Sequence, residues 1–70
     1  MATEKHLRLT GSSEVSWKDA ITTTISEASR SIDYLTRVII LEQSAKISGK
    51  KIVEYYVDLD LCFTIDKERE

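Results

Sequence analysis

The chain has 70 residues, of which 41% are hydrophobic and 31% charged, with ten Lys and Arg against twelve Asp and Glu. This length allows one domain, residues 1–70, and the formal charge of −2 argues against a nucleic-acid partner, which normally needs a basic patch. No apolar run approaches the roughly 20 residues of a membrane span, and the N-terminus lacks the apolar core of a signal peptide. We therefore expect a soluble, cytoplasmic protein with neither a nucleic-acid nor a membrane partner.

The first predicted element is a strand over residues 4–10. Apolar and polar side chains alternate here, with Leu7 and Leu9 on one side and polar residues on the other. This period of two is typical of a strand with one buried face. The Gly11-Ser12-Ser13 segment then ends the pattern.

A helix is predicted over residues 16–34. Ser16 is a suitable N-cap, and Asp19 three residues later completes a capping-box pattern. From Trp17 onward, apolar residues recur at spacings of three and four, which places them on one helix face. The last member of this stripe is Leu35.

Two strands follow the helix. The β-branched run Val38-Ile39-Ile40-Leu41 predicts a strand over residues 36–46 that is covered on both faces. A turn at Ser48-Gly49-Lys50 precedes a last strand in which every odd position from Val53 to Ile65 is apolar and nearly every even position is polar. Such sustained alternation indicates one dry and one polar face.

These elements predict an α+β fold with the order β-α-β-β. A helical crossover usually returns the chain parallel to the strand it left, and a hairpin then reverses it. The simplest arrangement places the third strand between the first two, in a three-stranded antiparallel sheet packed on one helix.

The length of the last strand predicts assembly. About 14 residues at roughly 3.3 Å each span about 46 Å, whereas a compact globule of this size is only about 28 Å across. The hairpin must overhang the helix, and its apolar side chains at Phe63 and Ile65 would then be exposed unless another protomer covers them. The alternative is a bulge that bends the strand around the helix.

Domains of this length are commonly stabilised by disulfides or a bound metal, and this sequence provides neither within one chain. Cys62 is the only cysteine and His6 the only histidine, so the sequence offers no disulfide and no complete zinc ligand set. Cys62 is expected on a polar face among aspartates that raise its pKa, and no activating base is identified. His6 is interpreted as a surface or interface residue.

Several segments together resemble the dodecin family. Gly11-Ser12-Ser13 followed by Ser16-Trp17-Lys18-Asp19-Ala20 is similar to the family's GSS…SWEDA segment. Glu42-Gln43 resembles the pair that closes its second strand, and the stretch from Tyr55 to Phe63 resembles its last strand. The similarity extends from about residue 5 to 65.

The resemblance implies a hollow homododecamer whose only macromolecular partner is itself. Family members bind flavins such as riboflavin or FMN in pairs at protomer interfaces, as storage proteins without catalytic activity. In those members a Trp stacks on the isoalloxazine and a Gln binds its edge. The matching positions here are Arg37 and Tyr56. Together with Gln43, they are the candidate residues for a flavin or another planar ligand.

Two alternatives remain open at this stage. Asp58 and Asp60 share the polar face of the last strand, and copies of them around a symmetry axis would form a ring of oxygens for calcium. Some family members without the stacking Trp are described as calcium binders. Alternatively, the chain is a structural oligomer that has lost the flavin site.

Overall fold

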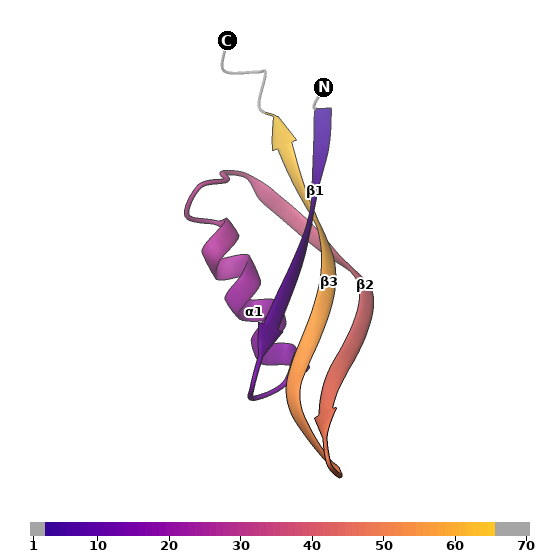
Figure 1. The fold of residues 1–70 in the computed structure, drawn as a ribbon. Coiled ribbons are helices and arrows are strands. Elements are labelled where there is room, and N and C mark those ends of the chain that lie inside the picture. Colours follow the sequence, from indigo (N-terminus) through magenta and orange to yellow (C-terminus); the bar gives the residue numbers. More distant parts are fainter. Residues whose placement is uncertain (1–2, 66–70) are drawn as a thin grey trace.

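The computed structural model describes residues 3–65 as one helix and three strands (Figure 1). The strands lie in the order β1-β3-β2, and β3 pairs antiparallel with both neighbours. The predicted β-α-β-β order, antiparallel sheet and central third strand are therefore confirmed. No helix in this part of the chain is long and apolar enough to cross a membrane. The elements are β1 (Thr3–Ser13), α1 (Trp17–Ala28), β2 (Leu35–Ser48) and β3 (Lys51–Ile65).

The N-terminus of α1 is capped by its own sequence. Ser16 Oγ accepts a hydrogen bond from the Asp19 backbone N–H at 3.0 Å, which confirms the predicted N-cap. The Asp19 carboxylate accepts instead from the Ser13 hydroxyl, at 2.7 Å. Ser13 in turn accepts the Val15 and Ser16 backbone N–H groups at 2.9 and 3.4 Å. These bonds join the end of β1 to the start of α1.

The predicted helix end at residue 34 is wrong. The helix ends at Ala28, with Ser29 as its C-cap, and residues 29–31 form a turn. The Ser29 hydroxyl donates to the Ser26 carbonyl at 2.8 Å, a local bond of the kind that lets serine compete with helical structure. Tyr34 then has a φ of 65°, in the left-handed region, which redirects the chain into β2.

The core lies between α1 and the sheet. Ala20 of the helix and Val57 and Leu59 of β3 are each 0% exposed and form one cluster. Trp17 packs against this cluster, meets the Tyr55 ring edge-on at 4.8 Å and donates from Nε1 to the Ser44 carbonyl at 2.9 Å. The sequence therefore placed Trp17 correctly, as a packing residue at the helix start.

Gly11 allows β1 to approach the helix closely. A Cβ atom at this position would overlap the Oγ1 atom of Thr24 in α1. No other residue type fits between β1 and α1 without movement of Thr24.

The sheet extends well beyond the helix. The described chain measures 56 × 19 × 13 Å, whereas the 12 residues of α1 span only about 18 Å at 1.5 Å each. The sheet projects past α1 at both ends: the β2–β3 turn lies beyond one end of the helix, and the start of β1 and the end of β3 lie beyond the other (Figure 1). Phe63 and Ile65, at the end of β3, are half-buried. The connection from α1 to β2 adjoins these two residues, because its Ile32 and Tyr34 line a hollow together with Phe63 and Ile65.

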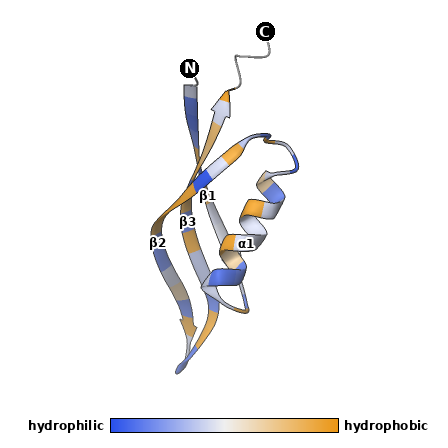
Figure 2. Ribbon diagram, turned by 180° about the vertical axis from the view of Figure 1, so that it is seen from behind, coloured by the Kyte–Doolittle hydropathy of each residue, from blue (hydrophilic) through white to orange (hydrophobic). Residues whose placement is uncertain are grey.

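Apolar side chains along the hairpin are left uncovered in the single chain. Figure 2 shows hydrophobic segments that continue along β2 and β3 past the helix. The prediction that the run beginning at Val38 is covered on both faces therefore fails within one chain. The large apolar residues exposed on the hairpin are Ile40 (49%), Leu41 (46%), Ile47 (67%), Ile52 (45%) and Val53 (40%).

Irregularities in the pairing of β2 with β3 decide which side chains share a face. The register shifts between Leu35 and Arg37, between Ile40 and Glu42, and between Lys46 and Ile47. Each extra residue reverses the alternation that follows it. From the sequence, a bulge that bends the strand was the alternative to an overhang. The structure contains both such bulges and an overhang. We call the sheet face opposite α1 the outer face.

Candidate functional site

The outer face carries the polar residues of β1 and β3 and part of β2. Residues paired across neighbouring strands point to the same side, so the register assigns the face. One group of side chains, which we call the Arg37 cluster, gathers near the start of β1 and the end of β3. Its members are Glu4, His6, Arg37, Asp60 and Cys62.

Arg37 and Glu4 form a two-point salt bridge across the central strand. Arg37 Nε and Nη2 lie 3.2 and 3.1 Å from the two Glu4 carboxylate oxygens. This pairing joins β2 to β1 over β3, and it is the geometry in which guanidinium binds carboxylate most strongly. The same hydrogen bonds lower the pKa of Glu4 and raise that of Arg37.

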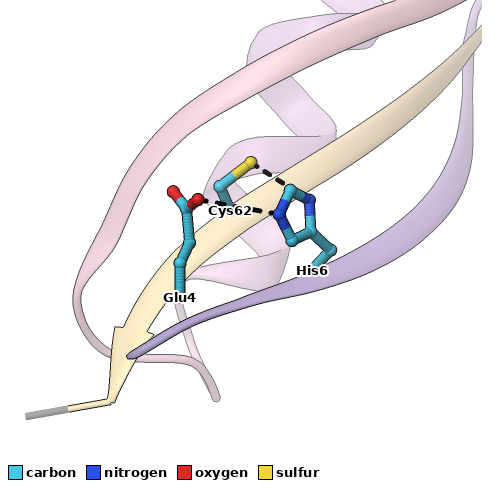
Figure 3. Close-up of side chains that lie close together, drawn as sticks. All are labelled: Glu4, His6 and Cys62. Carbon is cyan, nitrogen blue, oxygen red and sulfur yellow. Dashed lines mark hydrogen bonds and ion pairs between the residues drawn. The ribbon is translucent and has the colours of Figure 1, made fainter. Parts of the chain in front are cut away.

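His6 lies at the centre of this cluster. Its Nδ1 atom is 2.7 Å from Asp60 Oδ2 and 3.4 Å from Cys62 Sγ, while its Nε2 atom is 3.6 Å from Glu4 Oε1. Figure 3 shows the Glu4 and Cys62 side chains each facing a different part of the His6 ring.

Cys62 is fully buried although it belongs to the polar face. It is 0% exposed beneath the neighbouring side chains. Burial raises the pKa of its thiol, and the charges of Glu4 and Asp60 raise it further, against an opposing effect of Arg37. The sequence predicted this direction from the acidic neighbours, but the main cause is burial. At neutral pH the group is a thiol, so it is a poor nucleophile.

A second set of interactions surrounds Asp58. Its Oδ1 atom accepts from the Thr10 hydroxyl at 2.7 Å, and its Oδ2 atom accepts from Arg8 at 3.2 Å. These two hydrogen bonds lower the pKa of Asp58. Asp58 and Asp60, the two residues suggested for calcium, therefore both have partners within the chain.

The three candidate ligand-binding residues do not come together in one chain. Arg37 is in register with Cys62, whereas Tyr56 is in register with Ser44, so six residues of β3, or about 20 Å, separate them along the outer face. Gln43 pairs with Val57 and so lies on the opposite, helix-facing side. A joint site for these residues requires more than one copy of the chain.

Tyr56 has a local partner of its own. Its hydroxyl donates to Glu54 Oε1 at 3.1 Å, and this hydrogen bond is the main cause of its raised pKa. The ring is thus fixed over the outer face at the hairpin end of β3.

Arg37 also borders an apolar hollow between the helix and the start of β2. Its volume is about 190 Å³, below the roughly 300–1,000 Å³ of typical small-molecule pockets. One chain therefore supplies at most part of such a pocket. The hollow is lined by Ile25, Leu35, Thr36, Arg37, Val38 and Leu61.

The sequence did not predict the contact of His6 with Cys62. It placed both residues on polar strand faces and put their strands side by side. Only the register, which pairs His6 directly with Cys62, brings them together. No sequence signal fixes that register to one residue.

The fold and the sequence both define the class of protein. The dodecin family model matches residues 3–66. The chain therefore belongs to the dodecin family.

Solved structures show the same fold. An arginine-to-alanine mutant of T. thermophilus dodecin is 24% identical with a TM-score of 0.89, over 96% of this chain and 100% of that one. The dodecin of Streptomyces davaonensis is 21% identical with a TM-score of 0.87, over 94% and 97% of the two chains. The dodecin of Streptomyces coelicolor is 18% identical with a TM-score of 0.88, over 94% of each chain. No curated protein matches the sequence.

Proposed function

We propose that the protein is a non-catalytic homo-oligomer, dodecameric as in the family it resembles, that binds a flavin or another planar ligand at interfaces between its protomers. The observation that carries this proposal is the exposed apolar hairpin. Ile47, the most exposed large residue there, is 67% exposed, and four further large apolar residues are 40–49% exposed on the same two strands. Another copy of the chain is the partner that the family supplies.

The position of these residues supports self-assembly. β2 is an edge strand, so its outer backbone groups have no partner strand among residues 3–65. An exposed edge that also carries apolar side chains is a surface for protein association. Association would remove Ile40, Leu41 and Ile47 from water.

The state of Arg37 supports a planar ligand. Its salt bridge with Glu4 uses atoms on the edge of the guanidinium group, which leaves the two flat faces for stacking. The side chain is 56% exposed despite this pairing. Arg37 is therefore a fixed, planar and accessible group at the position that matches the family's stacking Trp.

A fluorescence titration tests the ligand. Riboflavin emission should be quenched as the protein is added. Arg37→Ala should weaken binding by about 2- to 30-fold, since a stacked cation contributes about 0.5–2 kcal/mol. Arg8→Ala is the matched control, because Arg8 lies on the same face but pairs with Asp58. Riboflavin emission that is unchanged at saturating protein rejects the flavin.

The two alternatives have distinct outcomes in the same experiments. A structural oligomer without ligand keeps its assembled mass and leaves riboflavin emission unchanged. A calcium site at Asp58 or Asp60 would have to replace the bonds these groups make to Thr10, Arg8 and His6. It would give a calorimetric signal with calcium that Asp58→Asn or Asp60→Asn removes.

A further inference from the structure

We propose that Glu4, His6 and Cys62 form a zinc-binding site on the outer face, beside Arg37, which pairs with Glu4. The three side chains come from two neighbouring strands. His6 pairs directly with Cys62, and Glu4 lies two residues before His6, so all three project from the same side of the sheet. Their ligand atoms lie within 4.8 Å of one another (Figure 3).

The donor atoms are close enough together for small side-chain movements to bring them to one zinc ion. With Zn–S of about 2.3 Å and Zn–N of about 2.0 Å, tetrahedral geometry places sulfur and nitrogen about 3.5 Å apart, and nitrogen and oxygen about 3.4 Å apart. Glu4 Oε1 is 3.6 Å from His6 Nε2, close to the second of these values. Cys62 Sγ is 3.4 Å from the other ring nitrogen, Nδ1, so a zinc ion on Nε2 requires the sulfur to approach that atom.

The surrounding hydrogen bonds select the histidine nitrogen. Asp60 Oδ2 is 2.7 Å from Nδ1 and accepts a hydrogen bond from it, which leaves the Nε2 lone pair for a metal. A carboxylate that holds the other ring nitrogen in this way is a regular feature of histidine–metal sites. With Nε2 as the ligand, the Cys62 thiol has to turn toward it from its present contact at Nδ1.

Arg37 holds the second carboxylate in a similar way. It donates to both oxygens of Glu4, and each oxygen retains a second lone pair for a metal. Ligating carboxylates are commonly oriented by such outer hydrogen bonds. The three ligands thus have two positioning residues, Asp60 for His6 and Arg37 for Glu4.

Charge and donor type both favour a borderline-soft divalent cation. With Cys62 as a thiolate, the three negative charges of Glu4, Cys62 and Asp60 and the positive charge of Arg37 leave a net charge of −2, which Zn²⁺ balances. Binding forms the Zn–S bond and releases the thiol proton to solvent. Sulfur and imidazole nitrogen are zinc ligands, whereas calcium requires oxygen.

The site remains open on one side. In the single chain the His6 and Glu4 side chains are 45% and 36% exposed, which leaves a metal an entry path and a fourth position for water. Cys62 closes the buried side, where it is 0% exposed.

Competition between the protein and a chromophoric chelator tests the proposal. After treatment with EDTA, the protein should withhold one Zn²⁺ per chain from the chelator. His6→Gln, Cys62→Ser and Glu4→Gln should each weaken this binding at least tenfold, and Asp60→Asn by about 10- to 100-fold. Glu42→Gln is the matched control for Glu4→Gln, since it removes a carboxylate from the same face without touching the cluster, and should bind as the wild type does.

Cobalt supplies a readout that does not depend on affinity. Co²⁺ in the wild-type protein should give a thiolate-to-metal charge-transfer band that Cys62→Ser abolishes. His6→Gln keeps the test informative if Cys62→Ser misfolds, because His6 is partly exposed; circular dichroism establishes that it is folded. Zinc that is not withheld from the chelator, binding unchanged in His6→Gln, or a cobalt spectrum without a thiolate band each overturns the proposal.

Discussion

Substitution of Gly11 tests how closely β1 packs on the helix. The added methyl group would overlap Thr24 Oγ1 and lie 3.3 Å from the Ala20 carbonyl oxygen. Overpacking of this kind costs about 1–3 kcal/mol. Gly11 has no positive φ, so alanine should recover about 0.4–1 kcal/mol from the unfolded chain. The net expectation for Gly11→Ala is a loss of about 1–2 kcal/mol.

Urea denaturation at one fixed protein concentration measures this loss. Trp17 is a suitable fluorescent probe, because it is the only tryptophan and packs against Tyr55. With a slope of about 1–3 kcal/mol/M, the midpoint should fall by about 0.3–2 M. A Gly11→Ala protein with the wild-type midpoint would contradict the packing described here.

A double-mutant cycle assigns the cost to one contact. Thr24→Ala removes Oγ1 and leaves Thr24 Cβ at 3.1 Å from the new methyl group, which is tight but not overlapping. Gly11→Ala should therefore cost clearly less in the Thr24→Ala background than in the wild type. Equal costs in the two backgrounds would refute Thr24 as the obstacle.

Three further predictions concern the core, the outer face and the hairpin. Leu59→Ala should cost about 2–5 kcal/mol in urea denaturation, because Leu59 is 0% exposed in the core; a cost below 1 kcal/mol would contradict that packing. Thr10 and Arg8 lower the pKa of Asp58 from its ordinary 3.8, so its stabilising contribution is complete above that pH and lost as the pH falls through the folded value. Asp58→Asn should make the free energy of unfolding depend less on pH in the acid range. An unchanged pH dependence would exclude this contribution. Ile47→Lys should reduce the assembled mass in solution without loss of secondary structure by circular dichroism; an undiminished mass would remove Ile47 from the interface.

The sequence predicted the fold well where a strong local period was present. The odd-numbered apolar residues of β3 indicated the buried face, and Val57, Leu59 and Leu61 are indeed 0–1% exposed. Ser16 likewise indicated the helix start. The helix end was missed because the apolar spacing continues through Ile32 and Leu35, which pack in the connection and in β2 instead.

The candidate site was harder to predict, because it depends on register. The extra residue near Leu41 turns Gln43 to the helix side, away from Arg37, and no glycine or proline marks that bulge. The cluster around His6 depends on its pairing with Cys62, 56 residues later. Alternation indicates which face a side chain occupies, but it does not indicate which residue lies opposite.

The mass of the protein in solution tests the central claim that one chain is incomplete. Light scattering coupled to size exclusion should give a homo-oligomer, with about 96 kDa for twelve chains of 8.0 kDa each. Assembly should persist on dilution to micromolar protein, because the proposed oligomer would cover the apolar hairpin. A folded 8.0 kDa particle that unfolds cooperatively at that concentration would contradict the account.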